Sequence, residues 1–201
     1  METRRVEGMD TDKQILADAR GGDGEAFRRV VEAYQTLVFN LAYRLTYNHA
    51  AAEDLAQECF LKLYRNFNRY DLSLPFKPWL VRIAINTGLS WLRRQKRHAS
   101  SPWSQETVEL QTQVETGPTA PGGLGDPARL AESEEMRQTV RRAVAALPPG
   151  YKAVTALRYF EGMDYETIGR TMEIPTGTVR VRLHRAREML RRKLTHMAEM
   201  Q

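Results

Sequence analysis

The densest group of side chains suited to molecular recognition lies near the C-terminus, between residues 180 and 193. This segment holds seven basic residues against one acidic residue, Glu188. Apolar residues recur within it at helical spacing, which predicts one narrow buried stripe on a helix. Arginine on the opposite face of such a helix can pair bidentately with guanine in the major groove of DNA. The stripe consists of Val179, Leu183, Ala186 and Leu190, and the basic face of Arg180, Arg182, His184, Arg185 and Arg187.

The residues in front of this helix strengthen the interpretation that it reads DNA. A short helix is predicted after Asp164, and a tight turn follows from Glu173 to Thr176. Two helices joined in this way form a helix-turn-helix, whose second helix enters the major groove. Thr176 and Thr178 then lie where a helix N-terminus meets a phosphate. The alternative is a solvated basic helix, and a helix-turn-helix alone does not distinguish among the many kinds of DNA-binding regulator.

Residues suited to catalysis are scattered. The four histidines have no metal-ligand spacing, and the chain contains neither a phosphate-binding loop nor a nucleophile motif. We therefore expect no catalytic residue, no metal site and no cofactor. The single cysteine, Cys59, cannot form an internal disulfide, which fits a reducing compartment. Its position in an apolar helical pattern predicts a small buried side chain in preference to a redox sensor.

Charge and composition divide the 201 residues into parts. Residues 10–97 carry 14 basic and 10 acidic side chains, and residues 128–201 carry 14 and 9. Residues 98–127 hold four carboxylates and no lysine or arginine, and are rich in Ser, Thr, Gln, Pro and Gly. This predicts two small helical domains, 10–97 and 128–201, joined by a flexible acidic linker and preceded by an extension, 1–9. Basic domains favour a polyanionic partner.

Helical periodicity covers both domains, and no strand pattern of useful length occurs, so the fold class is predicted to be all-α. Helix caps are expected at Asp23, Asn48, Asp126 and Asp164. The predicted helices cover approximately 12–20, 24–47, 49–68 and 78–98 in the first domain, and 127–146, 151–160, 165–172 and 176 onward in the second.

Three segments of the chain resemble the extracytoplasmic-function (ECF) sigma factors of bacterial RNA polymerase. AEDLAQECFLKLYRNF and PFKPWLVRIAINTGLSWLRRQKR are similar to the most characteristic parts of the family's region 2. LPPGYKAVTALRYFEGMDYETIGRTMEIPTGTVRVRLHRAREML is similar to its region 4. The resemblance covers roughly residues 25–97 and 128–194, in the family's order, on either side of a variable linker. It implies an alternative sigma factor, which binds core polymerase, recognises promoters and melts DNA without being an enzyme.

The resemblance also implies a role for each surface. The resemblance implies that the helix at 49–68 binds the clamp helices of the beta-prime subunit. Asp54, Gln57 and Glu58 share one face of this helix, because they are three and four positions apart. The C-terminal domain would meet the beta flap and the promoter's minus-thirty-five element, and the linker would thread toward the active-centre cleft. The implied polymerase-binding residues are Glu53, Asp54, Gln57 and Glu58; the implied minus-thirty-five residues are Thr176, Thr178, Arg180, Val181, Arg182, His184, Arg185 and Arg187.

Melting the minus-ten element requires a pocket for an unstacked base, together with aromatic and cationic groups along one strand. The resemblance assigns this work to the segment 69–86, with the loop 71–77 as a pocket wall. Trp79 and Phe67 are predicted to be core residues instead. The implied melting residues are Tyr70, Phe76, Lys77, Arg82 and Asn86, and the implied phosphate contacts beside them are Arg93, Arg94, Lys96 and Arg97.

Further partners and competing functions follow from the same reasoning. The resemblance implies an anti-sigma factor as a further partner. A cytoplasmic location with no membrane contact is expected, because the chain shows neither a signal peptide nor a long apolar segment. A helix-turn-helix regulator that acts without polymerase is one alternative; it leaves DLAQECF and WLVRIAIN unexplained. An enzyme is the other alternative.

Overall fold

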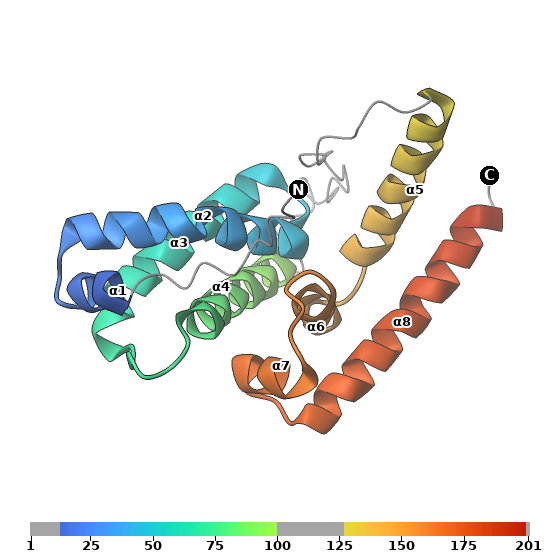
Figure 1. The fold of residues 1–201 in the computed structure, drawn as a ribbon. Coiled ribbons are helices and arrows are strands. Elements are labelled where there is room, and N and C mark those ends of the chain that lie inside the picture. The colour runs from blue at the N-terminus through green and yellow to red at the C-terminus, as the bar shows by residue number, and fades with distance from the viewer. Residues whose placement is uncertain (1–12, 100–126, 200–201) are drawn as a thin grey trace, which may run out of the picture.

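The computed structural model describes residues 13–99 and 127–199, and the side chains of residues 13–95 and 135–196. Every regular element in these ranges is a helix, which confirms the predicted all-α class (Figure 1). The predicted extension 1–9 and nearly all of the predicted linker lie outside the described residues. No helix in the described ranges is both long enough and apolar enough to cross a membrane.

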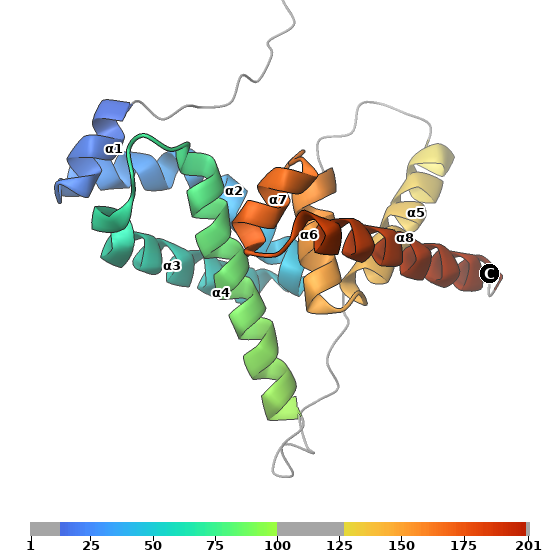
Figure 2. The same ribbon diagram turned by 90° about the horizontal axis from the view of Figure 1, so that it is seen from below.

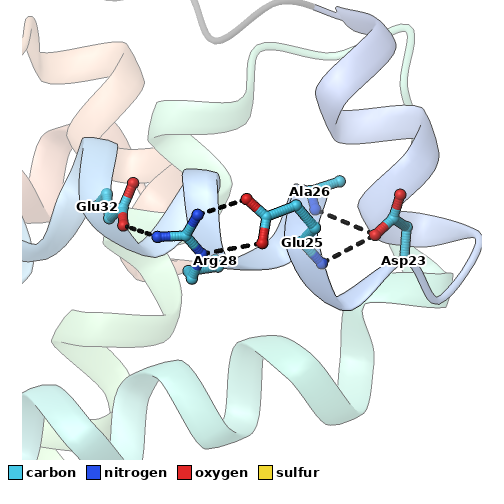
Figure 3. A network of polar contacts seen from close by, with 5 residues as sticks. All are labelled: Asp23, Glu25, Ala26, Arg28 and Glu32. Atoms are coloured by element: carbon cyan, nitrogen blue, oxygen red, sulfur yellow. Dashed lines mark hydrogen bonds and ion pairs between the residues drawn. The ribbon is translucent and has the colours of Figure 1, made fainter.

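Within residues 13–99, the N-terminal half contains four α-helices and one short 3-10 turn. Helices α2 and α3 begin at the predicted caps. The Asp23 carboxylate accepts hydrogen bonds from the backbone N–H groups of Glu25 and Ala26, at 2.8 and 3.3 Å (Figure 3). The Asn48 side chain accepts one from the N–H of Ala51 at 2.8 Å. The elements are α1 (Lys13–Arg20), α2 (Gly24–Thr46), α3 (His49–Asn66), η1 (Phe67–Arg69) and α4 (Phe76–Ala99).

Two details of this half differ from the sequence-based boundaries. Helix α4 begins at Phe76, so Pro78 lies within its first turn, where a missing N–H costs nothing. The end of α2 turns sharply at Tyr47, which adopts a left-handed conformation with φ 54° and is buried. The turn directs the chain into α3.

The described part of the C-terminal half, residues 127–199, contains four more helices, and the third and fourth of these form the predicted helix-turn-helix. Asp164 caps α7 by accepting a hydrogen bond from the N–H of Thr167. Helix α6 begins at Pro149, two residues before the predicted start, because a proline in the first turn is compatible with a helix. The elements are α5 (Pro127–Ala145), α6 (Pro149–Tyr159), α7 (Tyr165–Met172) and α8 (Thr176–Glu199).

The turn between α7 and α8 depends on a close backbone approach at Gly169. A Cβ atom at this position would lie 2.9 Å from the carbonyl oxygen of Ile174. Glu173 makes the turn in a left-handed conformation, with φ 55°. The absence of a side chain at Gly169 thus sets how tightly α7 and α8 are joined.

The two halves pack against each other. Helix α6 contacts α2 and α4, and α7 contacts α4 (Figure 2). The buried apolar side chains form one cluster that includes Leu41 and Leu45 of α2 together with Val154 and Leu157 of α6. The sequence predicts two domains on a linker, and it gives no sign of this shared core.

Candidate nucleic-acid interface

Helix α8 has the two-faced character that its sequence predicts. Val179, Leu183 and Ala186 are at most 2% exposed and anchor the helix to the rest of the C-terminal half. Arg180, Val181, His184, Arg185 and Arg187 are exposed. An exposed row of cations beside a buried stripe is the arrangement that lets a helix enter the major groove.

Three residues that were predicted to belong to this surface are half-buried. Arg182 is half-buried against the start of α6, where its Nη1 atom would lie 3.4 Å from a Cβ placed on Gly150. Arg182 therefore lies along α6, away from the outer row. Thr176 and Thr178 are half-buried, and the Thr176 hydroxyl lies on the side of the helix that faces Gly169.

A tyrosine that sequence reasoning missed lies beside the start of α8. The Arg180 guanidinium lies 6.0 Å from the centre of the Tyr165 ring, and that of Arg158 lies 5.3 Å from it. Arg158 also donates to the carbonyl oxygen of Met163 at 3.0 Å. These cation–π contacts restrict where the Arg180 side chain can lie before it meets any ligand.

The predicted polymerase-binding residues lie together on α3. Asp54 and Gln57 are exposed. Glu53 is exposed next to His49, with 3.5 Å between carboxylate and imidazole. Glu58 instead lies between two cations, 2.7 Å from the Lys62 amine and 3.4 Å from the Arg94 guanidinium. The hydrogen bond from Lys62 is the largest cause that lowers the pKa of Glu58.

The same side of α3 continues into apolar side chains. Leu61 is 55% exposed, and it follows Asp54 and Gln57 at helical spacing. Tyr64, one turn further, is 57% exposed and makes an edge contact with the ring of Phe27. Sequence periodicity places Leu61 outside the buried face, which is the signal that could have identified it.

The structure places Tyr70 and Phe76 differently from their predicted role. Both are 3% exposed and pack with Phe67 and Trp79 in an aromatic cluster under the loop between η1 and α4. The Tyr70 hydroxyl donates to the carbonyl oxygen of Leu74. Neither ring offers a face to a base, because other rings already cover it. Phe67 and Trp79 are packed as predicted.

The polar members of the predicted minus-ten set lie on α4. Asn86 and Arg93 are exposed, and Arg94 reaches back to Glu58. Lys77 and Arg82 are ion-paired with Glu161 and Glu173 of the C-terminal half. The side chains of Lys96 and Arg97 lie outside the described residues.

Residues that could support redox or metal chemistry give no centre in the described ranges. Cys59 is 1% exposed, and burial raises the pKa of its thiol to about 12, so the thiolate is disfavoured. Within residues 13–99 and 127–199, no group of three or more His, Cys, Asp and Glu side chains could hold a metal ion.

Comparison with known proteins adds independent evidence of the family to which the chain belongs. The family model of Sigma-70 region 2 matches residues 30–98, and that of Sigma-70 region 4 matches residues 137–190. The chain is 32% identical over 185 residues to the ECF RNA polymerase sigma factor SigW of Bacillus subtilis, covering 90% of this chain and 96% of SigW. It is 34% identical to the ECF RNA polymerase sigma-E factor of Escherichia coli K12, covering 92% and 94%.

Two solved structures share the fold. One is CnrH in complex with the cytosolic domain of CnrY, with a TM-score of 0.62 and 21% identity, covering 93% of this chain and 99% of that one. The other is the sigma factor RpoE in complex with the anti-sigma factor NepR from Bartonella quintana, with a TM-score of 0.63 and 22% identity, covering 84% and 96%.

Proposed function

The chain belongs to the ECF sigma factors of RNA polymerase, and from this premise we propose which of its surfaces perform each task. It is an alternative sigma factor, which binds core RNA polymerase and directs promoter recognition, DNA melting and the start of transcription. The observation that carries this conclusion is the presence of regions 2 and 4, in order, on a chain that spans more than nine-tenths of SigW.

The proposed division follows the predicted boundaries. Residues 10–97 form the domain that binds polymerase and the minus-ten element, and residues 128–201 form the domain that binds the minus-thirty-five element. Residues 98–127 join them, after an N-terminal extension at 1–9. No surface is assigned to catalysis, to a metal or to a cofactor, and the protein acts where polymerase acts, in the cytoplasm.

The exposed side of α3 is the proposed polymerase contact. Glu53, Asp54 and Gln57 offer carboxylate and amide oxygens to arginines and lysines of the beta-prime clamp helices, and Leu61 adds an apolar surface beside them. Glu58 has a second role, because its pairing with Lys62 and Arg94 also ties α3 to α4. Buried apolar contact flanked by charge is the usual composition of a specific interface.

The proposed minus-ten surface runs along α4. Asn86 is exposed and uncharged, so it can hydrogen-bond the edge of an unstacked base. Lys77, Arg82, Arg93 and Arg94 provide cations for the phosphates of the separated strand, together with Lys96 and Arg97. Tyr70 and Phe76 support the 71–75 loop from beneath, and the loop itself faces the strand.

The outer row of α8 is the proposed minus-thirty-five surface. Arg180, Val181 and His184 lie near the helix start and contact base edges, whereas Arg185 and Arg187 contact phosphates. Arg182 holds α8 to α6, and Thr176 and Thr178 contact the backbone near the helix N-terminus. RpoE of Bartonella quintana binds an anti-sigma factor, and we propose that a protein of that kind controls this chain too.

The polymerase contact is tested by charge reversal on the exposed side of α3. Asp54→Lys with Gln57→Lys leaves the Glu58 pairs intact and should weaken binding to core polymerase about tenfold or more, because like charges then face each other. The matched control is Glu32→Lys with Gln35→Lys on α2, which makes the same change in net charge at two exposed positions; Glu32 pairs with Arg28 (Figure 3). Equal core affinity of the two variants would contradict the assignment of α3.

A further inference from the structure

The ring of Tyr165, the first residue of α7, meets two cations that come from two other helices of the C-terminal half. The Arg180 guanidinium of α8 lies 6.0 Å from the centre of this ring, and the Arg158 guanidinium of α6 lies 5.3 Å from it. The three helices contact one another (Figure 1). The face of an aromatic ring carries partial negative charge, so both cations are attracted to it. The ring therefore links the end of α6 and the first turns of α8 to the start of α7.

The Tyr165 ring is itself held in place. The Asp164 carboxylate accepts a hydrogen bond from the N–H of Thr167 at 2.6 Å, which fixes the first turn of α7. Tyr165 is half-buried and packs against the hydrophobic core cluster. A ring that begins a capped helix and packs on the core keeps its orientation, so it can orient a side chain that contacts it.

Arg158 already occupies one position beside this ring. Its Nη1 atom donates to the carbonyl oxygen of Met163 at 3.0 Å, which anchors the side chain between the end of α6 and the loop before α7. Two guanidinium groups repel each other, so Arg180 cannot enter the position that Arg158 holds. The anchored Arg158 thus narrows the set of positions that Arg180 can take beside the same ring.

Arg180 has few other contacts that could orient it. Its side chain is exposed, and it forms no ion pair within the described residues. His184, one turn further along the outer row, instead lies 3.7 Å from the Glu188 carboxylate. An exposed arginine samples many rotamers, and fixing one of them on binding costs conformational entropy. The contact with Tyr165 removes part of that cost before DNA binds.

Orientation matters more for reading a base than for contacting a phosphate. The guanidinium pairs bidentately with the O6 and N7 atoms of guanine only when its N–H groups point along the edge of the base. A phosphate accepts a cation from many directions and carries no sequence information. An arginine whose orientation is restricted by a ring is therefore better suited to base reading than a mobile one.

We propose that Tyr165 is a positioning residue for minus-thirty-five recognition, whose ring holds the Arg180 guanidinium in the orientation that reads a base pair. The proposal rests on the proposed function, since it requires Arg180 to contact a base edge. Tyr165 acts through Arg180 and makes the holoenzyme selective at that base pair. Loss of the ring lets Arg180 contact other groups, whereas loss of the hydroxyl alone changes nothing, because the ring face attracts the cation.

The test compares holoenzymes that carry full-length variants, on a promoter library randomised over the minus-thirty-five element. Arg180→Ala identifies the base pair that Arg180 reads. Tyr165→Leu should lower discrimination at that base pair about two- to fivefold, the ratio that corresponds to an exposed cation–π contact. Tyr165→Phe should keep the wild-type profile, because it keeps the ring. Tyr159→Leu is the matched control, since this tyrosine is 57% exposed and belongs to neither cation contact.

Two further measurements separate positioning from a purely structural role. Damage to the helix-turn-helix would weaken transcription from all sequences alike, whereas lost positioning lowers discrimination at one base pair. In an Arg180→Ala background, Tyr165→Leu should change the profile no further, because the two residues act as one unit. Tyr165→Met is a second variant without the ring, and its flexible side chain fills the gap if Tyr165→Leu is unstable.

Several results would overturn the role of Tyr165. These are unchanged discrimination in both variants that lack the ring, equal losses in Tyr165→Leu and Tyr165→Phe, and a further loss in the Arg180→Ala background. An unchanged profile in Arg180→Ala would overturn it too, because the ring would have no base-reading arginine to position. The proposed function fails separately, if wild-type holoenzyme initiates at no promoter.

Discussion

The two proposed DNA surfaces, on α4 and on α8, carry similar cationic side chains but differ in whether those cations are ion-paired. On α4, Lys77, Arg82 and Arg94 are each paired with a carboxylate. On α8, Arg180 and Arg185 form no ion pair within the described residues, and Arg180 lies beside the Tyr165 ring. Residue type therefore predicts what a surface can bind, whereas availability depends on what the fold places opposite it.

This difference has a functional consequence. The outer row of α8 is exposed, whereas Lys77 and Arg82 of α4 must separate from Glu161 and Glu173 before they can bind phosphates. Each change described next acts on one of these surfaces, or on the contact between the two halves.

The largest effect is expected from the protonation of Lys152, which lies between the two halves and donates to the carbonyl oxygen of Leu45. Burial lowers the pKa of Lys152 from 10.5 to about 8, so the folded chain favours the neutral amine. Because unfolding restores the ordinary pKa, protonation opposes folding by about 3 kcal/mol below pH 8, and this opposition fades as the pH rises toward 10. The free energy of unfolding, measured by urea denaturation of the full-length chain, should therefore increase over that range.

Tyr47 sets the upper limit of the same titration. Burial raises the pKa of Tyr47 from 10.0 to about 12, so the folded chain favours the neutral phenol and loses stability as the pH rises above 10. The free energy of unfolding should peak near pH 10. Lys152→Met should remove the increase between pH 8 and 10 and leave the decrease above it. A flat response in the wild-type chain would show that the Lys152 amine keeps its ordinary pKa when the chain folds.

The next effect concerns the geometry of the α8 surface. Gly169→Ala places a Cβ 2.9 Å from the Ile174 carbonyl oxygen and should destabilise the helix-turn-helix by about 1–3 kcal/mol. Gly177→Ala is the matched control, because nothing lies within 4 Å of its added Cβ. Thermal unfolding followed by circular dichroism checks both. Core polymerase affinity should be unchanged in Gly169→Ala, and a loss of that affinity would mean that the two halves fold as one unit.

A more selective effect, confined to particular base pairs, is expected at the start of α8. Arg180→Ala should cost about 1–3 kcal/mol at particular base pairs of the minus-thirty-five element and broaden tolerance there. Arg191→Ala should leave the preference profile unchanged, because the residue lies three turns further along the helix. A saturation-mutagenised promoter library transcribed by each holoenzyme measures both profiles. Identical profiles would show that Arg180 contacts the DNA backbone only.

The smallest effect is expected on α4, at Asn86. Asn86→Ala removes a hydrogen-bonding group but no charge, so open-complex formation should slow several-fold while closed-complex binding persists. A template already unpaired at the minus-ten element should restore the rate, because melting is then unnecessary. Failure of the unpaired template to restore it would mean that Asn86 has no part in melting.

Local patterns predict much of this molecule. The caps at Asp23, Asn48 and Asp164 accept the hydrogen bonds that their positions imply. The buried stripe of α8 follows from its spacing alone, because a helix repeats every 3.6 residues. These features depend on neighbours within one or two turns, which a single sequence displays directly.

Features that depend on contacts between residues far apart in the sequence could not be predicted from the sequence. Tyr70 and Phe76 have the composition of a stacking site, and only the arrangement of η1 against α4 shows that their rings face inward. Arg182 lies on the same helix as Arg180, but its side chain packs against the start of α6. The Arg82–Glu173 pair joins positions with no local relation, so no periodicity could reveal it.

Run-off transcription with bacterial core RNA polymerase on a pool of genomic fragments tests the central claim most directly. With the wild-type chain added, transcripts should begin at discrete sites that share one sequence near minus-ten and another near minus-thirty-five. The same reaction with Asp54→Lys and Gln57→Lys should lose these transcripts. If the chain alone bound duplex DNA tightly, and core polymerase with it produced no new start sites, the protein would be a regulator that acts without joining polymerase.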